Sequence, residues 1–352
     1  MRSKKINMIF LTICLFFVGL IVNPLKINAN NMLIPNSENI SPNIIQLIEN
    51  NGESMTGTNI TISEVQYVLD TDFEPNYILV TLDNGGYIIS SIDGKISEMS
   101  LNDDSNPYQN CINVPLVYAG AFNYYKYENG ILINIKDNTL LHSGFNEKIR
   151  KKSQEFIETS KNEIRSSVSN GSGGMTWHGI TSSRFSRYAG SGWINNGEVG
   201  YCGPYAAAIM MAYCDDYVND NLIPASVRTR NSSNPGTLIT KLISLTPHAN
   251  ETLPNHVSTG INSFISNYSI DTSFGTSTNL YGTYAYVKLQ CDNNRPICVG
   301  TIKGDYGQHW VTVYQYAIGT STKYYRCVDN WGEYEVYFDY SWTLGSVYLT
   351  NV

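Results

Sequence analysis

One cysteine of this chain stands where a helix should begin. Cys202 lies between Gly200 and Gly203, and the proline and apolar run that follow suit the first turns of a buried helix. A thiol there lies at the positive end of the helix dipole, which lowers its pKa, and the outward backbone N–H can help to hold an oxyanion. A lone cysteine more often packs into a core. Because the glycines would leave room for a substrate around the sulfur, we predict that Cys202 is a nucleophile.

A thiolate nucleophile needs a general base, and one histidine is well placed to supply it. His309 opens a predicted strand, whose alternation sets His309, Val311 and Val313 on one face. From that position the ring can face a cleft while the strand fixes its backbone. A structural histidine at a strand end is the alternative that the sequence leaves open. The other histidines of the second half, His178, His248 and His256, lie in predicted loops or beside a predicted linker.

A third group should orient the imidazole, and the next predicted strand ends with candidates for it. Asp329 follows His309 by 20 residues, as a hairpin would require, and shares a strand face with Trp331. The carboxylate of Asp329 would accept from the imidazole N–H, and Trp331 would shield the pair from water. Asn330 points to the other face. The bland alternative is that Asp-Asn before Trp-Gly simply makes a turn.

The order of these parts resembles that of papain-like cysteine peptidases. In that family a cysteine starts a helix, a histidine opens a strand, and Asn or Asp precedes Trp-Gly, as at Cys202, His309 and residues 329–332 here. The Cys-Gly-Pro start is similar to the bacterial branch near the bacteriocin-processing (double-glycine) peptidases, and to streptopain and staphopain. The separation of Cys202 and His309, 107 residues, is shorter than the roughly 130–150 of papain.

The resemblance implies roles for further residues. The oxyanion-hole Gln of the family stands six residues before the nucleophile, where this chain has Asn196, an amide donor on a shorter stem. Alignment on Trp-Gly puts Asp329 at the family's Asn position, and a streptopain-like alignment favours Asn330 beside the tryptophan. The resemblance also implies hydrolysis of peptide bonds through a thiolate and an acyl-enzyme, without a cofactor.

The elements that must position these residues form a predicted α+β catalytic domain over residues 176–352. We expect one buried helix over 202–217, then antiparallel strands near 297–302, 310–316, 324–328, 335–340 and 346–350. Residues 30–165 form a separate small α+β domain, with a helix over 42–51, strands over 77–82, 87–92 and 96–99, and a hairpin over 122–135. It ends in a polar helix over 146–165, and a Ser/Gly-rich linker over 166–175 follows.

Residues 1–29 are typical of a secretory signal peptide, with a basic start, an apolar run over 8–22 and a small residue, Ala29, at the cleavage point. That run is shorter than the roughly 20 residues that span a bilayer, so we expect a secreted, extracellular protein without a membrane anchor. Residues 30–175 carry 18 acidic and 9 basic residues, a net charge of −9, whereas 176–352 carry 12 and 10, a net charge of −2. This balance argues against a nucleic-acid partner.

The place of the acidic unit, between the signal peptide and the catalytic domain, resembles the inhibitory pro-segments of secreted cysteine peptidases. We therefore expect a zymogen and a monomer, whose partners are a peptide or protein substrate and its own pro-domain as an intramolecular inhibitor. No Cys/His spacing of zinc type occurs, so we predict no structural metal. The four remaining cysteines of the last domain can pair or stay buried thiols: Cys214, Cys291, Cys298 and Cys327.

Two other functions remain open. One is a cell-wall (peptidoglycan) amidase or endopeptidase of the Cys-His type, although we find no wall-binding repeats. The other is a secreted binding protein whose papain-like domain has lost its activity. The presence of Cys202, His309 and the Asp-Asn pair together argues against that second alternative.

Overall fold

The computed structural model describes residues 40–352 except 73, 129–130, 141–173, 197–198, 248–251, 269, 272, 281–282, 303–307 and 320–321. The predicted signal peptide, the predicted helix over 146–165 and residues 166–173 of the predicted linker lie outside this part. Within it the chain has a mixed α+β fold built on a large antiparallel sheet. None of the described helices is long and apolar enough to cross a membrane.

The N-terminal unit, residues 40–140, begins with helix α1 (Pro42–Thr56), which has proline in its first turn and ends at Gly57 in the left-handed region. The helix was expected to end near Gly52, and this was wrong. Gly52 lies on the buried face, where a Cβ would come within 2.4 Å of the Ile60 side chain, so it serves close packing. The strands are β1 (Ile62–Val68), β2 (Tyr77–Leu82), β3 (Tyr87–Ser91), β4 (Ile96–Ser100), β5 (Leu116–Tyr118), β6 (Tyr124–Glu128) and β7 (Ile131–Asn134).

The C-terminal unit, residues 176–352, contains the helix predicted over 202–217, which is confirmed as α3 (Cys202–Tyr217). Its strands are β8 (Thr176–Gly179), β9 (Gly275–Asn279), β10 (Ile297–Ile302), β11 (Gln308–Ile318), β12 (Lys323–Val328), β13 (Val336–Asp339) and β14 (Thr343–Thr350). The five predicted strands correspond to β10–β14. The sequence did not predict α4 (Leu238–Leu245), α5 (Pro254–Asn267) and α6 (Thr283–Asp292).

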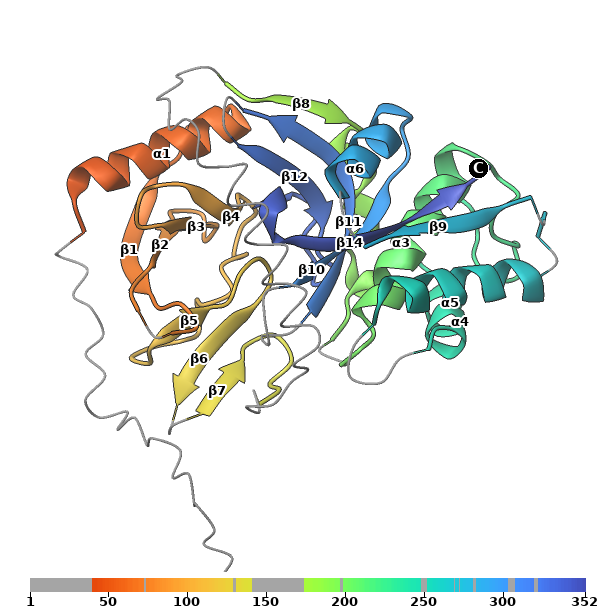
Figure 1. The fold of residues 1–352 in the computed structure, drawn as a ribbon, viewed down its shortest axis with the longest axis horizontal. Coiled ribbons are helices and arrows are strands. Elements are labelled where there is room, and N and C mark those ends of the chain that lie inside the picture. The colour runs from red at the N-terminus through yellow and green to blue at the C-terminus, as the bar shows by residue number, and fades with distance from the viewer. Residues whose placement is uncertain are drawn as a thin grey trace, which may run out of the picture.

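The two units share one antiparallel sheet, in which the strand order is β1-β2-β3-β4-β13-β12-β11-β10-β14-β9 and β8 pairs with β11. The junction is β4 against β13, with Tyr337 opposite Met99 and Phe338 opposite Glu98. Figure 1 shows the N-terminal unit, orange to yellow, on one side of the blue strands and helices α3–α5 on the other. Strands β5, β6 and β7 form a second, small sheet.

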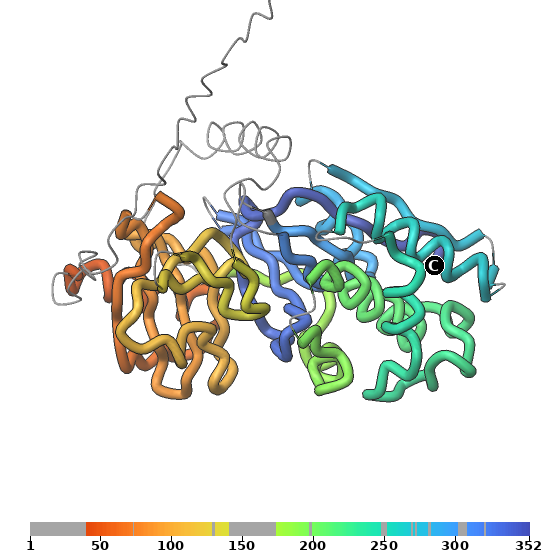
Figure 2. Tube along the Cα trace, turned by 90° about the horizontal axis from the view of Figure 1, so that it is seen from below, coloured from red at the N-terminus to blue at the C-terminus, as the bar shows by residue number. Residues whose placement is uncertain are grey.

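Further contacts tie the two units together along this junction. The Trp342 indole donates to the Ser97 hydroxyl (2.8 Å), and the Tyr324 hydroxyl donates to the Ile96 carbonyl (3.0 Å). Tyr324 and Tyr337 are buried in one apolar cluster with α1 and the strands of the N-terminal unit. Seen from below, the units lie side by side along the long axis of the molecule (Figure 2). They therefore form one continuous structure.

The two faces of the central strands carry different cores. On one face Trp310 and Tyr314 pack with α3, and the Thr312 hydroxyl donates to the Ala206 carbonyl of that helix (2.9 Å). On the other face Val311 and Val313 pack with α6 and with two residues of the N-terminal unit, Ala121 and Phe122. Helix α3 is buried over nearly its whole length, as its small and apolar side chains require.

Candidate functional site

Cys202 is the first residue of α3 and is buried, with 8% of its surface exposed. Its sulfur lies 4.0 Å from the backbone carbonyl oxygen of Gln308, the residue before His309. The start of α3 and the start of β11 therefore meet at the Cys202 sulfur. No hydrogen bond joins the Cys202 sulfur to the His309 ring among the residues that the structure describes.

Two opposing effects act on the Cys202 thiol. Burial is the larger, and it raises the pKa to about 11. The backbone N–H groups of Trp310, Gly203 and Cys202 itself act in the other direction because they stabilise a negative sulfur. The effect expected from the helix start is thus present, but burial outweighs it. The same N–H groups are donors that an oxyanion at this place could use.

The space beside the thiol is more filled than the glycines suggested. A Cβ on Gly203 would come within 2.5 Å of the Thr252 side chain and 2.9 Å of that of Val257. The Thr252 hydroxyl donates to the Gly200 carbonyl (2.5 Å), which holds this threonine against the helix start. Gly203 therefore allows the start of α3 to approach the segment before α5 closely, rather than leaving an open space at its own Cα.

His309 is the second residue of β11 and is also buried, with 3% of its surface exposed. Its Nε2 lies 2.6 Å from the backbone carbonyl oxygen of Asp329, so Nε2 carries the proton and donates it. Nδ1 is then the nitrogen left to accept a proton. The ring stacks on Trp331 with centroids 3.8 Å apart. Burial lowers the pKa of His309 to about 3, against the opposing effect of the Asp329 carbonyl, so the imidazole is neutral.

The structure brings Asp329 to His309, but through a different atom from the one predicted. Its carboxylate Oδ1 accepts from the N–H groups of Trp331 (2.8 Å) and Glu333 (2.9 Å), which closes the turn after β12. The backbone carbonyl is the group that holds the imidazole. Burial raises the pKa of the Asp329 carboxyl to about 7. The turn that the sequence left open as an alternative is therefore the role of this side chain here.

Asn330 connects the two elements that carry the candidate pair. Its side-chain Nδ2 donates to the Trp310 carbonyl on β11 (2.6 Å) and to the Cys202 carbonyl on α3 (3.3 Å). Its Oδ1 is buried and has no hydrogen-bond partner among the described residues. Its φ of 65° is in the left-handed region, which asparagine tolerates better than most residues. Asn330 thus lies at the centre of the site.

Asn196, the predicted oxyanion donor, has an exposed side chain. Its neighbour Asn195 is buried instead, and the Asn195 N–H donates to the Asn330 carbonyl (2.8 Å). The segment before α3 therefore approaches the site one residue earlier than the six-residue spacing implied. The spacing alone could not reveal this, because a count of residues does not fix which of two adjacent asparagines faces inward.

Three side chains of the N-terminal unit lie near the stacked rings of His309 and Trp331, and none of them was predicted. Phe122 lies 5.4 Å from the His309 ring and 6.3 Å from Trp331, measured between ring centroids. Tyr124 lies 6.2 Å from Trp331, and the Lys136 ammonium stands 5.4 Å over the same indole. The hairpin signal near residues 122–135 located this segment, but nothing in the sequence indicated what it covers.

The other candidate ligands and nucleophiles do not assemble into a second site. His178 is exposed on β8, and the Nδ1 of His256 in α5 accepts from the Leu253 N–H (3.3 Å); His248 lies outside the described residues. The remaining thiols of the C-terminal unit are free and buried: Cys214, Cys291, Cys298 and Cys327. Over the described part of the chain, no three His, Cys, Asp or Glu residues are grouped as metal ligands would be.

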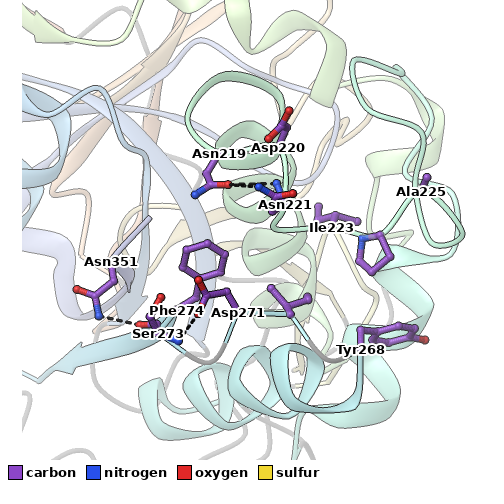
Figure 3. A pocket seen from close by; sticks show the side chains of 12 residues that line it. Asn219, Asp220, Asn221, Ile223, Ala225, Tyr268, Asp271, Ser273, Phe274 and Asn351 are labelled. Carbon is purple, nitrogen blue, oxygen red and sulfur yellow. Dashed lines mark hydrogen bonds between the residues drawn. The ribbon is translucent and has the colours of Figure 1, made fainter.

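A pocket of about 800 Å³ lies at the opposite end of α3 (Figure 3). It is lined by residues after that helix, including Asn219 and Asn221, and by Phe274 and Asn351 from the segments around β9 and β14. A helix of 16 residues is about 24 Å long, so the pocket is remote from Cys202. We do not assign it to the chemistry of the cysteine.

Comparison with known proteins gives no family for this chain. No protein-family model matches it, and no curated protein matches it. The arrangement itself must therefore carry any functional argument. It places a thiol at a helix start, a neutral imidazole held by its Nε2, and an amide that bridges their two elements. Such a set can supply a nucleophile, a base and backbone oxyanion donors.

Proposed function

We propose that this protein is a secreted cysteine peptidase of papain-like type, made as a zymogen, in which Cys202 is the nucleophile and His309 the base. The observation that carries the proposal is the bridge made by Asn330, whose amide joins the Cys202 carbonyl to β11 one residue beyond His309. The stacking of Trp331 on the imidazole adds support, because it shields the Nε2 hydrogen bond from water. A merely structural cysteine and histidine would need neither arrangement.

The reaction would follow from these positions. His309 Nδ1 takes the Cys202 proton, and the thiolate forms a C–S bond to the amide carbonyl while the π electrons move to oxygen. Backbone N–H groups at the start of α3 hold that oxyanion. Collapse of this tetrahedral intermediate breaks the C–N bond, and the imidazolium gives its proton to the leaving amine. Water, deprotonated by His309, then attacks the thioester, which releases the carboxylic acid and restores the thiol.

The N-terminal unit would be the inhibitory pro-domain. Its Phe122 lies against the His309 ring, and both members of the catalytic pair are buried. With the thiol pKa at about 11 and the imidazole neutral, the pair is not the thiolate–imidazolium ion pair that such peptidases need. The intact chain would therefore be inactive, and secretion in this form would protect the producing cell.

The test is a comparison of two cysteine variants in the chain that follows the signal, residues 30–352, assayed after an added serine protease has degraded the N-terminal unit and has itself been inhibited. We expect treated Cys202→Ala to hydrolyse neither casein nor peptidoglycan, and the untreated variant to keep the thermal transition of the parent. Cys214→Ala is the matched control, because Cys214 is a buried thiol of the same helix. Its activity should equal that of the parent.

Activity that survives Cys202→Ala would contradict the whole assignment. Hydrolysis of peptidoglycan without hydrolysis of casein would favour the cell-wall amidase or endopeptidase instead. The absence of both, together with full processing by other proteases, would favour a binding protein. The N-terminus and mass of the protein in culture medium would test secretion and removal of residues 1–29.

A further inference from the structure

Glu98 is a buried carboxylate that has no basic partner among the described residues. It lies on β4, at the junction with β13, and none of its surface is exposed. Four neutral donors surround it: the Tyr87 hydroxyl (2.6 Å) and the Tyr124 hydroxyl on Oε1, and the Tyr118 hydroxyl (3.1 Å) and the Phe122 N–H (3.0 Å) on Oε2. Elsewhere in the described fold the buried Asp216 and Asp339 have Arg228 and Lys95 as partners.

Phe122 is held in an unfavourable backbone conformation. Its φ is 66°, in the left-handed region that bulky residues rarely adopt, so the surrounding structure must enforce it. Phe122 is at the tip of the hairpin between β5 and β6, where the Asn123 N–H donates to the Gly120 carbonyl (2.9 Å). This conformation places the phenyl ring in the cluster of Val311 and Phe338, against His309.

The Glu98 carboxylate accepts the backbone N–H of the strained residue itself. This hydrogen bond is fully buried, and breaking it would leave the Phe122 N–H without a partner, so the contact is suited to hold the left-handed conformation. The three tyrosines fix the carboxylate in turn, because each donates to it from a buried hydroxyl. Glu98 therefore links the core of the N-terminal unit to the residue that covers the imidazole.

We propose that Glu98 is the positioning residue that closes the candidate active site, by holding Phe122 on the His309 ring. This inference rests on the proposed function only in one respect, namely that covering His309 would inhibit a peptidase. The Glu98–Phe122 contact itself involves no catalysis. Loss of the Glu98–Phe122 hydrogen bond relaxes the hairpin tip, and the imidazole then becomes accessible to solvent and substrate. Both residues of this hydrogen bond lie in the N-terminal unit, so the contact covers His309 in the uncleaved chain.

Two substitutions of Glu98 separate its reach from its charge. Glu98→Asp keeps the charge but shortens the side chain, so it cannot contact the three tyrosines and the Phe122 N–H together. Glu98→Gln keeps the length, and its amide oxygen can accept from Phe122 while its NH₂ donates to tyrosine hydroxyls, which also accept. We therefore expect Glu98→Asp to open the site and Glu98→Gln to keep it closed.

The experiment measures accessibility of the imidazole with diethyl pyrocarbonate, in residues 30–352 carrying Cys202→Ala so that no self-cleavage occurs. Site-resolved mass spectrometry gives the modification rate of His309, and exposed His178 is the internal reference. Relative to His178, we expect Glu98→Asp and Phe122→Ala to raise the rate at His309 by about tenfold or more, as loss of one buried hydrogen bond or of the covering ring allows. Glu98→Gln should stay within about twofold of the parent.

Val80→Ala is the matched control for general destabilisation, because Val80 is buried on β2 away from the site. Equal exposure of His309 in Val80→Ala and Glu98→Asp would overturn the proposal, as would a folded Glu98→Asp with parental protection. If Glu98→Asp does not fold, Phe122→Ala and Glu98→Gln still decide the matter. These modification rates do not depend on peptidase activity. They therefore test the role of Glu98 separately from the proposed function.

Discussion

In the intact chain the Cys202 thiol is a poor nucleophile for a physical reason. Burial raises its pKa to about 11, so roughly one sulfur in ten thousand is ionised at pH 7. The backbone N–H groups around the sulfur do not by themselves compensate for the loss of hydration of a buried thiolate. Contact with solvent or with an imidazolium would supply the additional stabilisation. His309 supplies no such charge while burial keeps its pKa near 3. The low reactivity of the thiol in the intact chain therefore results from the burial of both Cys202 and His309.

This low reactivity predicts the pH dependence of alkylation. In residues 30–352, iodoacetamide should label Cys202 at a rate that keeps rising with pH beyond pH 9, because the thiolate population grows up to a pKa of about 11. In the processed form that we propose, the pair is free to ionise, and labelling of Cys202 should level off below pH 8. Peptide mass spectrometry measures both rates. A plateau below pH 8 in the intact chain would contradict this account.

Asp329 and Asn330 offer a second prediction for single residues. Asp329→Asn keeps the Oδ1 acceptor for the turn and keeps the carbonyl that holds His309, so kcat/KM should stay within about threefold of the parent. Asn330→Ala removes the amide between Cys202 and Trp310, and it should lower kcat/KM by about a hundredfold through misplacement of the pair. A larger loss in Asp329→Asn would restore the sequence-based assignment of the carboxylate.

At the scale of elements, the sequence predicted one buried helix and five strands of the C-terminal unit from their apolar patterns. Helix α3 and strands β10–β14 appeared because apolar side chains recur there with a helical or strand period. Helices α5 and α6 were missed because they mix polar residues, tyrosines and Gly260 with few apolar positions, and tertiary packing holds them. The turn after β12 was only the alternative to a strand face shared by Asp329 and Trp331, because the left-handed φ of Asn330, which decides the atom of Asp329 that faces His309, has no local signal in the sequence.

The start of α3 gives the prediction at this scale. In an exposed helix Gly203→Ala would stabilise by about 1 kcal/mol. Here the new Cβ meets Thr252, which is buried and bonded to Gly200, so overpacking should win and cost roughly 1–3 kcal/mol in the free energy of unfolding. Thermal or urea unfolding measures it. Gly190→Ala is the control, since no atom lies within 4 Å of its Cβ position.

The double variant Gly203→Ala/Thr252→Ser tests the cause. Thr252→Ser removes the methyl group that the new Cβ approaches most closely and keeps the hydroxyl for the Gly200 carbonyl. We expect it to restore part of the lost stability. A fully destabilised double variant would mean that the strain lies elsewhere at the helix start.

At the scale of the whole molecule, the pairing of β4 with β13 decides how the two units behave. These strands lie more than 230 residues apart in the sequence, and no local pattern predicts their contact. The same pairing buries Tyr324 and Tyr337 of the C-terminal unit, and it brings the hairpin tip to the imidazole. The sequence predicted an inhibitor on a flexible tether, whereas a shared sheet makes association independent of the tether.

Cutting the predicted linker should therefore not separate the units. We expect residues 30–352, with a site-specific protease site inserted within 166–173, to yield two fragments that elute together in gel filtration and part only in denaturant. Met175 and Trp177 support this, because the Met175 N–H donates to the Ser54 carbonyl (2.9 Å) and the Trp177 indole to the Met55 carbonyl (2.7 Å), so the chain after the cut stays bound to α1.

The nicked protein should remain inactive on peptides until the N-terminal unit is itself degraded. Residues 176–352 alone, with both tyrosines exposed, should bind a hydrophobic dye. Fragments that separate in plain buffer, with activity appearing at once, would show that the linker holds the inhibitor in place.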